Sequence, residues 1–185
     1  FVIFTDKGKK ILKKINSSHE RIDFIDDHNN HAIGKIKDLE NFKEYQNAFV
    51  GIGNNKLRDE LIDLLEQLGY QVPVLIHPTA YISRSALIEA GTVVEPQAIV
   101  NANTKIKKGS IVSVGAIIDH DVTLGKCVHV NAGAIVEAGG KVKDFEKLEA
   151  GSVRRGFRQA LVTANSNDEF VREEKEKTGM DISFF

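Results

Sequence analysis

With 185 residues the chain suits one large or two small domains, and its 25 basic and 26 acidic residues nearly cancel, so charge favours neither nucleic acid nor a membrane surface as a partner. No apolar run approaches the roughly 20 residues of a membrane span, and no signal-peptide pattern is visible. The single cysteine, Cys127, excludes an intrachain disulfide and favours a reducing, cytoplasmic location.

Residues 1–76 alternate short apolar runs with helical patterns. The apolar runs lie at 1–4, 22–25, 48–52 and 72–76, and the helical patterns lie at 8–16, 38–45 and 55–69. The last helix is the clearest, because its leucines follow the 3.6-residue period and Gly69 supplies a C-terminal stop. Those leucines are Leu57, Leu61, Leu64, Leu65 and Leu68. Alternating strands and helices predict a small parallel sheet with right-handed crossovers.

Ligands of such sheets bind outside the carboxyl ends of the strands, and three predicted strand ends carry suitable residues. The first has Gly8 among three lysines. The second ends in Asp26 and Asp27, which can accept hydrogen bonds from a ribose or a base. The third has Gly53 and Asn54 before a helix N-terminus, where free backbone N–H groups favour anions. Each has a structural alternative, because the aspartates suit a turn and Asn54 suits a helix cap.

From Ile76 to Leu148 an aliphatic residue occupies every sixth position without a gap. The thirteen residues are Ile76, Ile82, Ile88, Val94, Val100, Ile106, Val112, Ile118, Leu124, Val130, Val136, Val142 and Leu148. A small or β-branched residue follows four positions after each of the first eleven. A period of six fits neither a helix nor a flat strand, but it is typical of a parallel β-helix in which three hexads close one coil. Stacked positions are then 18 residues apart, and the open ends of the coil need caps.

After Leu148 the rhythm fails, because Arg154 takes the next inward position. The segment 166–169 has the pattern of a capping box and predicts a short charged helix that reaches Thr178, with Gly179 at its end. We expect this helix to cap the coil and to take no part in chemistry. The sequence therefore divides into a small α/β unit (1–76), a hexapeptide-repeat β-helix (77–153) and a C-terminal tail (154–185).

Two of the six histidines lie in one stretch of the repeats. His120 comes two residues after an inward aliphatic, so its ring should point outward near a corner, with Ala102 and Ala138 as small stacking neighbours. The adjacent Asp121 can orient the imidazole and raise its basicity, as a general base requires. His129 lies on the next face. A plain surface histidine is the structural alternative for His120, and the spacing of these groups does not predict a metal site.

Five segments together resemble the bacterial sugar acetyltransferases that include the UDP-4-amino-sugar N-acetyltransferases and the sialic acid O-acetyltransferases. They are Phe24-Ile25-Asp26-Asp27, Gly51-Ile52-Gly53-Asn54-Asn55-Lys56-Leu57-Arg58, Leu75-Ile76-His77-Pro78-Thr79-Ala80, Gly115-Ala116-Ile117-Ile118-Asp119-His120-Asp121 and His129-Val130-Asn131-Ala132-Gly133-Ala134. The resemblance covers about residues 1–142. It implies a truncated Rossmann-like α/β domain, then a left-handed β-helix and a short C-terminal helix.

The resemblance also implies a reaction. His120 is the expected general base, Asp121 is its modulator, and His129 and Ala138 are expected to contact acetyl-CoA, the acyl donor. The acceptor, an amino or hydroxyl sugar carried on a nucleotide or related to sialic acid, is expected near the strand ends described above. A homotrimer with active sites between subunits follows from the same family.

Two features differ from the family pattern. The first loop keeps only Gly8 where the family has about three glycines, and the side chains at the other positions crowd a phosphate. The regular hexads also stop near Leu148, so the glycine-rich final coils are absent. These differences motivate a second hypothesis, a trimeric binding or scaffold module that has lost efficient catalysis.

Overall fold

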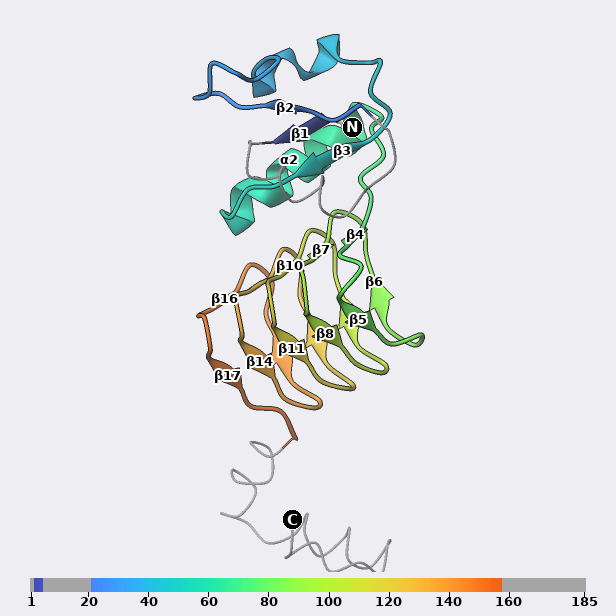
Figure 1. The fold of residues 1–185 in the computed structure, drawn as a ribbon, viewed down its shortest axis with the longest axis vertical. Helices are drawn as coiled ribbons and strands as arrows, with labels where there is room; N and C mark the ends of the chain where they lie inside the picture. The colour runs from blue at the N-terminus through green and yellow to red at the C-terminus, as the bar shows by residue number, and fades with distance from the viewer. Residues whose placement is uncertain (1, 5–20, 158–185) are drawn as a thin grey trace, which may run out of the picture.

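The computed structural model describes residues 2–4 and 21–157, and its N-terminal unit is built on a parallel sheet (Figure 1). Strand β1 (Val2–Phe4) lies between β2 (Asp23–Ile25) and β3 (Ala48–Val50). The 3-10 helix η1 (Ile36–Asn41) follows β2, and the α-helix α2 (Asn55–Gln67) follows β3. The carboxyl ends of all three strands therefore meet at one edge of the sheet.

Three of the predicted elements in this unit differ from the structure or lie outside the described residues. The helix expected at 38–45 is the shorter 3-10 helix η1, and the helix expected at 8–16 lies outside the described residues. The apolar run 72–76 does not join the small sheet. Instead its last two residues form β4 (Leu75–Ile76), which pairs with a strand of the repeats and is the first strand of the coil.

Helix α2 begins and ends as its sequence predicts, and it buries most of the predicted leucine face together with further residues. The Asn54 side chain accepts hydrogen bonds from two backbone N–H groups of the first turn, each at 3.2 Å, and Gly69 follows the helix with a φ of +85°. Leu57, predicted to face inward, is 38% exposed, whereas Arg58 and Ile62 are fully buried. Leu61 and Leu65 are buried as predicted, and the buried face extends to Arg58 and Ile62 because the helix packs on the coil as well as on the sheet.

The repeats form a parallel β-solenoid, which confirms the predicted β-helix. Its further strands are β5 (Tyr81–Ile82), β6 (Leu87–Ile88), β7 (Val93–Val94), β8 (Ile99–Val100), β9 (Lys105–Ile106), β10 (Ile111–Val112), β11 (Ile117–Ile118), β12 (Thr123–Leu124), β13 (His129–Val130), β14 (Ile135–Val136), β15 (Lys141–Val142), β16 (Lys147–Leu148) and β17 (Val153–Arg154). They make three parallel sheets, in the orders β16-β13-β10-β7-β4, β17-β14-β11-β8-β5 and β15-β12-β9-β6. Paired residues are 18 apart, as between Val112 and Val130.

The second residue of each strand points into the coil. The inward aliphatics from Val94 to Val136 are at most 1% exposed, and the small corner residues between them, such as Ala116 and Thr104, are also buried. Burying a branched aliphatic side chain contributes about 1.5–3 kcal/mol, so this column is the main stabilising feature of the coil. At the first strand Ile76 is 37% exposed, because no coil precedes it.

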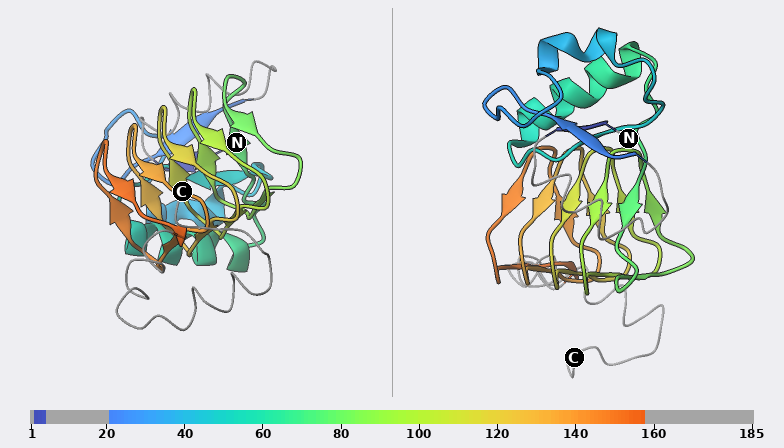
Figure 2. Two further views of the ribbon diagram at one scale, coloured as in Figure 1. Left: turned by 90° about the horizontal axis from the view of Figure 1, so that it is seen from below. Right: turned by 45° about the horizontal axis from the view of Figure 1, so that its top comes forward.

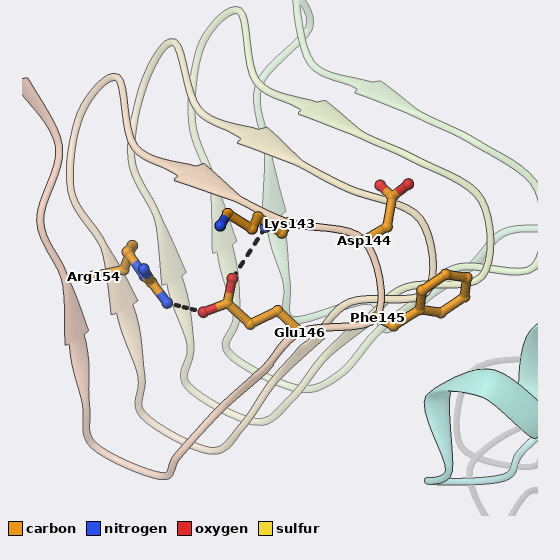
Figure 3. Close-up of a pocket in the computed structure, with 5 residues that line it drawn as sticks. All are labelled: Lys143, Asp144, Phe145, Glu146 and Arg154. Carbon is orange, nitrogen blue, oxygen red and sulfur yellow. Dashed lines mark hydrogen bonds and ion pairs between the residues drawn. The ribbon is translucent and has the colours of Figure 1, made fainter.

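The coil extends one strand beyond the last predicted hexad. Strand β17 pairs with β14 and aligns Arg154 with Val136, so the path continues although the inward residue is charged. In Figure 3 the Arg154 guanidinium bonds one carboxylate oxygen of Glu146, and the other oxygen accepts from the backbone N–H of Lys143. A paired charge thus follows the apolar column at this end. The helix expected from Ser166 lies outside the described residues.

Helix α2 fixes the small unit along one side of the coil, a placement that all the views share (Figures 1 and 2). The helix runs along one corner of the coil. The stacked residues at this corner have positive φ, and they are Gly91, Gly109, Cys127 and Phe145. A helical turn rises about 5.4 Å. Stacked coils are about 4.8 Å apart. Successive turns of the helix therefore meet successive coils: Ile62 lies against both glycines, and the Asn55 side chain reaches the Phe145 carbonyl at 2.9 Å.

Arg58 makes the central contact of this interface. Its guanidinium donates to the carbonyl oxygens of Gly109 (2.6 Å), Ile52 (2.8 Å) and Cys127 (2.9 Å), and to the Asn55 side-chain oxygen (2.8 Å). Burial lowers the pKa of Arg58 from its ordinary value, and the four acceptors take up its N–H groups. The side chain therefore connects the loop after β3 to two coils.

We predict that Arg58→Met lowers the free energy of unfolding by about 3 kcal/mol or more, because several buried carbonyls lose their donor at once. Urea unfolding followed by circular dichroism measures the change. Glu60→Ala, on the exposed side of the same helix, is the control and should change stability by no more than ~0.5 kcal/mol. A loss below 1 kcal/mol in Arg58→Met contradicts the role given to this arginine.

Candidate active site

His120 lies at the corner that follows β11, outside the aliphatic column. Its side chain is 51% exposed, and its Nδ1 lies 2.7 Å from Oδ2 of Asp121. Asp121 has a φ of +58°, a left-handed conformation that Asp tolerates better than most residues, and this conformation turns the corner. A proton on Nδ1 that is shared with the carboxylate leaves Nε2 as the acceptor on the exposed side of the ring.

The surroundings of this pair favour the charged form of both groups. The hydrogen bond that His120 donates to the Asp121 carboxylate raises the pKa of His120 above its ordinary value, and the negative charges of Asp119 and Asp121 add to the rise. The same bond is the largest cause of the lowered pKa of Asp121. Because both side chains are exposed, water screens these effects. The pair is thus a more basic imidazole beside a fixed carboxylate, as a general base requires.

Small residues flank His120 in the neighbouring coils. The Asp121 N–H donates to the carbonyl of Ala102 at 2.9 Å, and the His120 carbonyl accepts from Gly139 N at 3.0 Å, one residue after Ala138. The predicted stacking neighbours, Ala102 and Ala138, therefore lie directly before and after His120 along the coil. Their methyl side chains leave room for a ligand beside the imidazole.

A hollow of about 260 Å³ lies between the end of β3 and the outer side of the sheet that contains β7, β10 and β13. Its lining comprises Phe49, Val50, Gly51, Gly53, Val93, Glu95, Ile111, Ser113, Val114, His129, Asn131 and Ala132. His129 Nε2 lies 3.1 Å from Ser113 Oγ. The hollow has an apolar floor and a few polar groups, which is the usual composition of a small-molecule site.

Of the predicted substrate-binding residues, the structure brings only Gly53 to this hollow. Asn54 caps helix α2, as its structural alternative predicted. The carboxylates of Asp26 and Asp27 accept backbone N–H groups of the loop after β2, at 2.9 Å each, and neither residue lines the hollow. Gly8 lies outside the described residues.

The two predicted cofactor contacts lie at different places within one chain. Ala138 is beside His120, at the corner between the sheets of β11 and β12, whereas His129 is on the sheet of β13 and lines the hollow. The strand β12, which belongs to the third sheet, separates the two histidines. One chain alone therefore does not place His120 at the hollow.

Sequence reasoning did not single out the polar side of the hollow. Glu95, Ser113 and Asn131 are 18 residues apart and belong to one stacked column, so the coil register could have revealed them. Glu95 also accepts the Val114 N–H at 3.0 Å, which fixes its carboxylate at the rim. A larger hollow of about 430 Å³ lies at the last coil, as an open groove lined mainly by charged residues around Glu146 (Figure 3).

Two further features are absent from the described residues. Within residues 2–4 and 21–157, no three His, Cys, Asp or Glu side chains gather closely enough to hold a metal ion. Over the same residues, no helix combines the length and the apolar character needed to cross a membrane.

We predict that Asp121→Asn lowers the pKa of His120 toward its ordinary value, because the variant loses the negative charge and the carboxylate hydrogen bond that favour the imidazolium. Titration of the His120 ring by NMR measures this directly. Asp144→Asn, an exposed carboxylate on a different corner, is the control and should leave the titration unchanged. An unchanged His120 pKa in Asp121→Asn contradicts the pairing.

Comparison with solved structures identifies the family. The acetyltransferase domain of PglB from Neisseria gonorrhoeae FA1090 is 31% identical over 84% of this chain and 82% of that chain, with a TM-score of 0.78. The same domain in complex with acetyl coenzyme A gives 30% identity, coverages of 84% and 81%, and a TM-score of 0.77. PerB from Caulobacter crescentus, in complex with CoA and GDP-perosamine, shares the fold at 24% identity, with coverages of 84% and 88% and a TM-score of 0.72.

No protein-family model matches the chain, and no curated protein matches it. Because the match to the PglB domain covers 84% of this chain, it includes residues of both the small unit and the coil. The chain belongs to the bacterial hexapeptide-repeat sugar acetyltransferases.

Proposed function

We propose that this protein transfers the acetyl group of acetyl-CoA to the amino group of a nucleotide-activated sugar. The observation that carries the proposal is the His120–Asp121 pair at an exposed corner of a coil that belongs to this family. The related PglB domain binds acetyl coenzyme A, and PerB, which shares the fold, binds CoA and GDP-perosamine. A hydroxyl group in place of the amine is the O-acetyl variant of the same chemistry.

In the proposed reaction, His120 acts on the proton of the acceptor. The amine nitrogen attacks the thioester carbonyl carbon, and His120 Nε2 takes the proton that the nitrogen loses as the C–N bond forms. The tetrahedral intermediate then expels sulfur, and the same proton passes to the thiolate. The products are the amide and free CoA. Asp121 holds the ring and stabilises the imidazolium between the two proton transfers.

We propose that the working unit is a homotrimer, because one sheet of the coil carries an uncovered apolar column. The outward residues of the sheet β17-β14-β11-β8-β5 are Tyr81, Ile99, Ile117, Ile135 and Val153. On the sheet that contains β4 and β7, by contrast, Phe49 of the small unit covers Leu75 and Val93. The third sheet carries Lys105 and Lys141 on its outside. A second copy is the occupant that suits an apolar column of this length.

The same contact completes the active site. His120 follows β11, the middle strand of this sheet, so its corner borders the apolar column, and a neighbour packed on the column receives that histidine at its own hollow. The two contacting faces differ, and such a head-to-tail contact closes only in a ring. The acyl donor then lies between Ala138 and His120 of one copy and His129 of the next, and the sugar lies at Gly53 of the next copy.

Finer features of the sequence analysis complete the proposal. We infer that the coil is left-handed and that the small α/β unit binds the sugar. Asp26 and Asp27 remain proposed sugar contacts at the carboxyl end of β2, and cytoplasmic acetyl-CoA is the donor. The scaffold hypothesis has less support, because the His–Asp pair is intact and the chain resembles a domain solved with acetyl coenzyme A.

We predict that His120→Ala lowers kcat by about 10²–10⁴-fold while stability changes by no more than ~0.5 kcal/mol, because the ring lies outside the core. Thiol release from acetyl-CoA is measured with a panel of nucleotide-linked amino sugars and sialic acids, and thermal unfolding is followed in parallel. His77→Ala, a histidine of the first coil, is the control. Full activity in His120→Ala, or no turnover of any acceptor by the folded parent trimer, rejects the proposal.

We predict that Ile117→Asp converts the trimer to monomers, because a carboxylate in the middle of the apolar column loses its hydration on assembly. Thr123→Asp, the outward residue of the next strand on the third sheet, is the matched control and should remain trimeric. Light scattering after size-exclusion chromatography measures the mass. Dissociation of Thr123→Asp together with an intact Ile117→Asp trimer would show that the interface lies on the third sheet, and would contradict the proposal.

A further inference from the structure

The corner that carries Asp121 stands directly above an equivalent corner of the preceding coil, which carries Asn103. The two residues are 18 apart and adopt nearly the same left-handed conformation, with φ values of +57° and +58°. Asn103 Nδ2 donates to Asp121 Oδ1 at 3.1 Å, and Asp121 Oδ2 lies 2.7 Å from His120 Nδ1. The two carboxylate oxygens therefore have different partners, one in the coil below and one on the imidazole.

We propose that Asn103 is a positioning residue of the active site, which holds the Asp121 carboxylate so that its second oxygen faces His120 Nδ1. This inference rests on the proposed function, in which His120 is the general base. Asp121 is 44% exposed, and a carboxylate in water rotates freely unless a second contact fixes it. The asparagine amide supplies that contact and has no charge to compete with the imidazole.

The column of residues to which Asn103 belongs has a polar partner in the coil below and an aromatic ring, that of Phe157, over Gly139 in the coil above Asp121. Asn103 is itself held by the coil below, because its backbone N–H donates to Ser85 Oγ at 3.0 Å. In the coil above Asp121 the equivalent residue is Gly139, which has no side chain to compete for the carboxylate. The column therefore ends at Asp121 and leaves the carboxylate directed to its own coil, where His120 lies.

The chemical consequence is a choice of tautomer. A neutral histidine carries its proton on only one of its two ring nitrogens. The hydrogen-bond partner of each nitrogen decides which one is protonated. With the Asp121 carboxylate fixed at Nδ1, the proton resides there and Nε2 keeps its lone pair toward the exposed side. Without Asn103 the carboxylate rotates, and the His120 tautomer protonated on Nε2 gains population. This tautomer cannot take a proton from the sugar amine at Nε2.

Two variants test this inference. Asn103→Gly removes the side chain and keeps a residue that tolerates positive φ. Asn103→Asp keeps the shape but removes the donor and repels Asp121, and it serves as the backup if the glycine variant fails to fold. We expect ¹⁵N NMR of neutral His120 to show a lower fraction protonated on Nδ1 in both variants. We expect kcat to fall about three- to tenfold, the value of one hydrogen bond, with little change in KM.

Asn101→Ala is the matched control. Asn101 makes the neighbouring contact of the same kind, from its Nδ2 to Asp119 Oδ1 at 3.2 Å, but that carboxylate meets the backbone N–H of His120 and not its ring. The control should keep the parent tautomer. An unchanged tautomer in both Asn103 variants, or an equal shift in Asn101→Ala, overturns the inference. Absence of turnover in the parent rejects only the proposed function, because the NMR measurement needs no substrate.

Discussion

The 18-residue stacking register of the coil is the constraint on which the rest of the structure depends. It aligns the inward aliphatics into one buried column and the outward residues of one sheet into an apolar column. It also sets Asn103 beneath Asp121 and places Glu95 and Ser113 in one line at the hollow. Parallel pairing maintains the register over successive coils, so a one-residue insertion near the middle of the coil would misalign all of these features together.

A second level of order comes from the docking of helix α2. A helical turn and a coil spacing have similar lengths. Ile62 therefore meets the coils of Gly91 and Gly109, Arg58 meets those of Gly109 and Cys127, and Asn55 meets the coil of Phe145. Arg58 also holds the carbonyl of Ile52, in the loop that joins β3 to α2. The neighbouring Gly51 and Gly53 are thereby kept over the sheet that carries His129, and the hollow forms between them. One buried cation thus links the small sheet, the coil and the proposed sugar site.

The parts of the structure that could be predicted from sequence are those with a repeating signal. The six-residue period predicts the coil, its corners and the outward direction of His120, because each feature recurs at a fixed spacing. Contacts between distant segments have no such signal, so the sequence placed a ligand site at Gly53 but did not reveal the burial of Arg58 or the part that Glu95 and Ser113 take in the hollow. Local hydrogen bonding explains two other differences: Asn54 serves as a helix cap, and Asp26 and Asp27 fold their own loop. At Arg154 the apolar period ends although the backbone path continues, since pairing uses the main chain.

The central claim is that His120 of one copy acts at the hollow of the next copy. Mixed trimers test it directly, assembled by co-expressing His120→Ala with Gly53→Trp; the tryptophan fills the hollow, and no atom lies within 4 Å of the position its Cβ would take. Each variant alone should be inactive. In random mixed rings about a quarter of the sites combine an intact histidine with an intact hollow, so about a quarter of the parent activity should return. Mixed trimers that stay as inactive as their parents would contradict a site shared between copies.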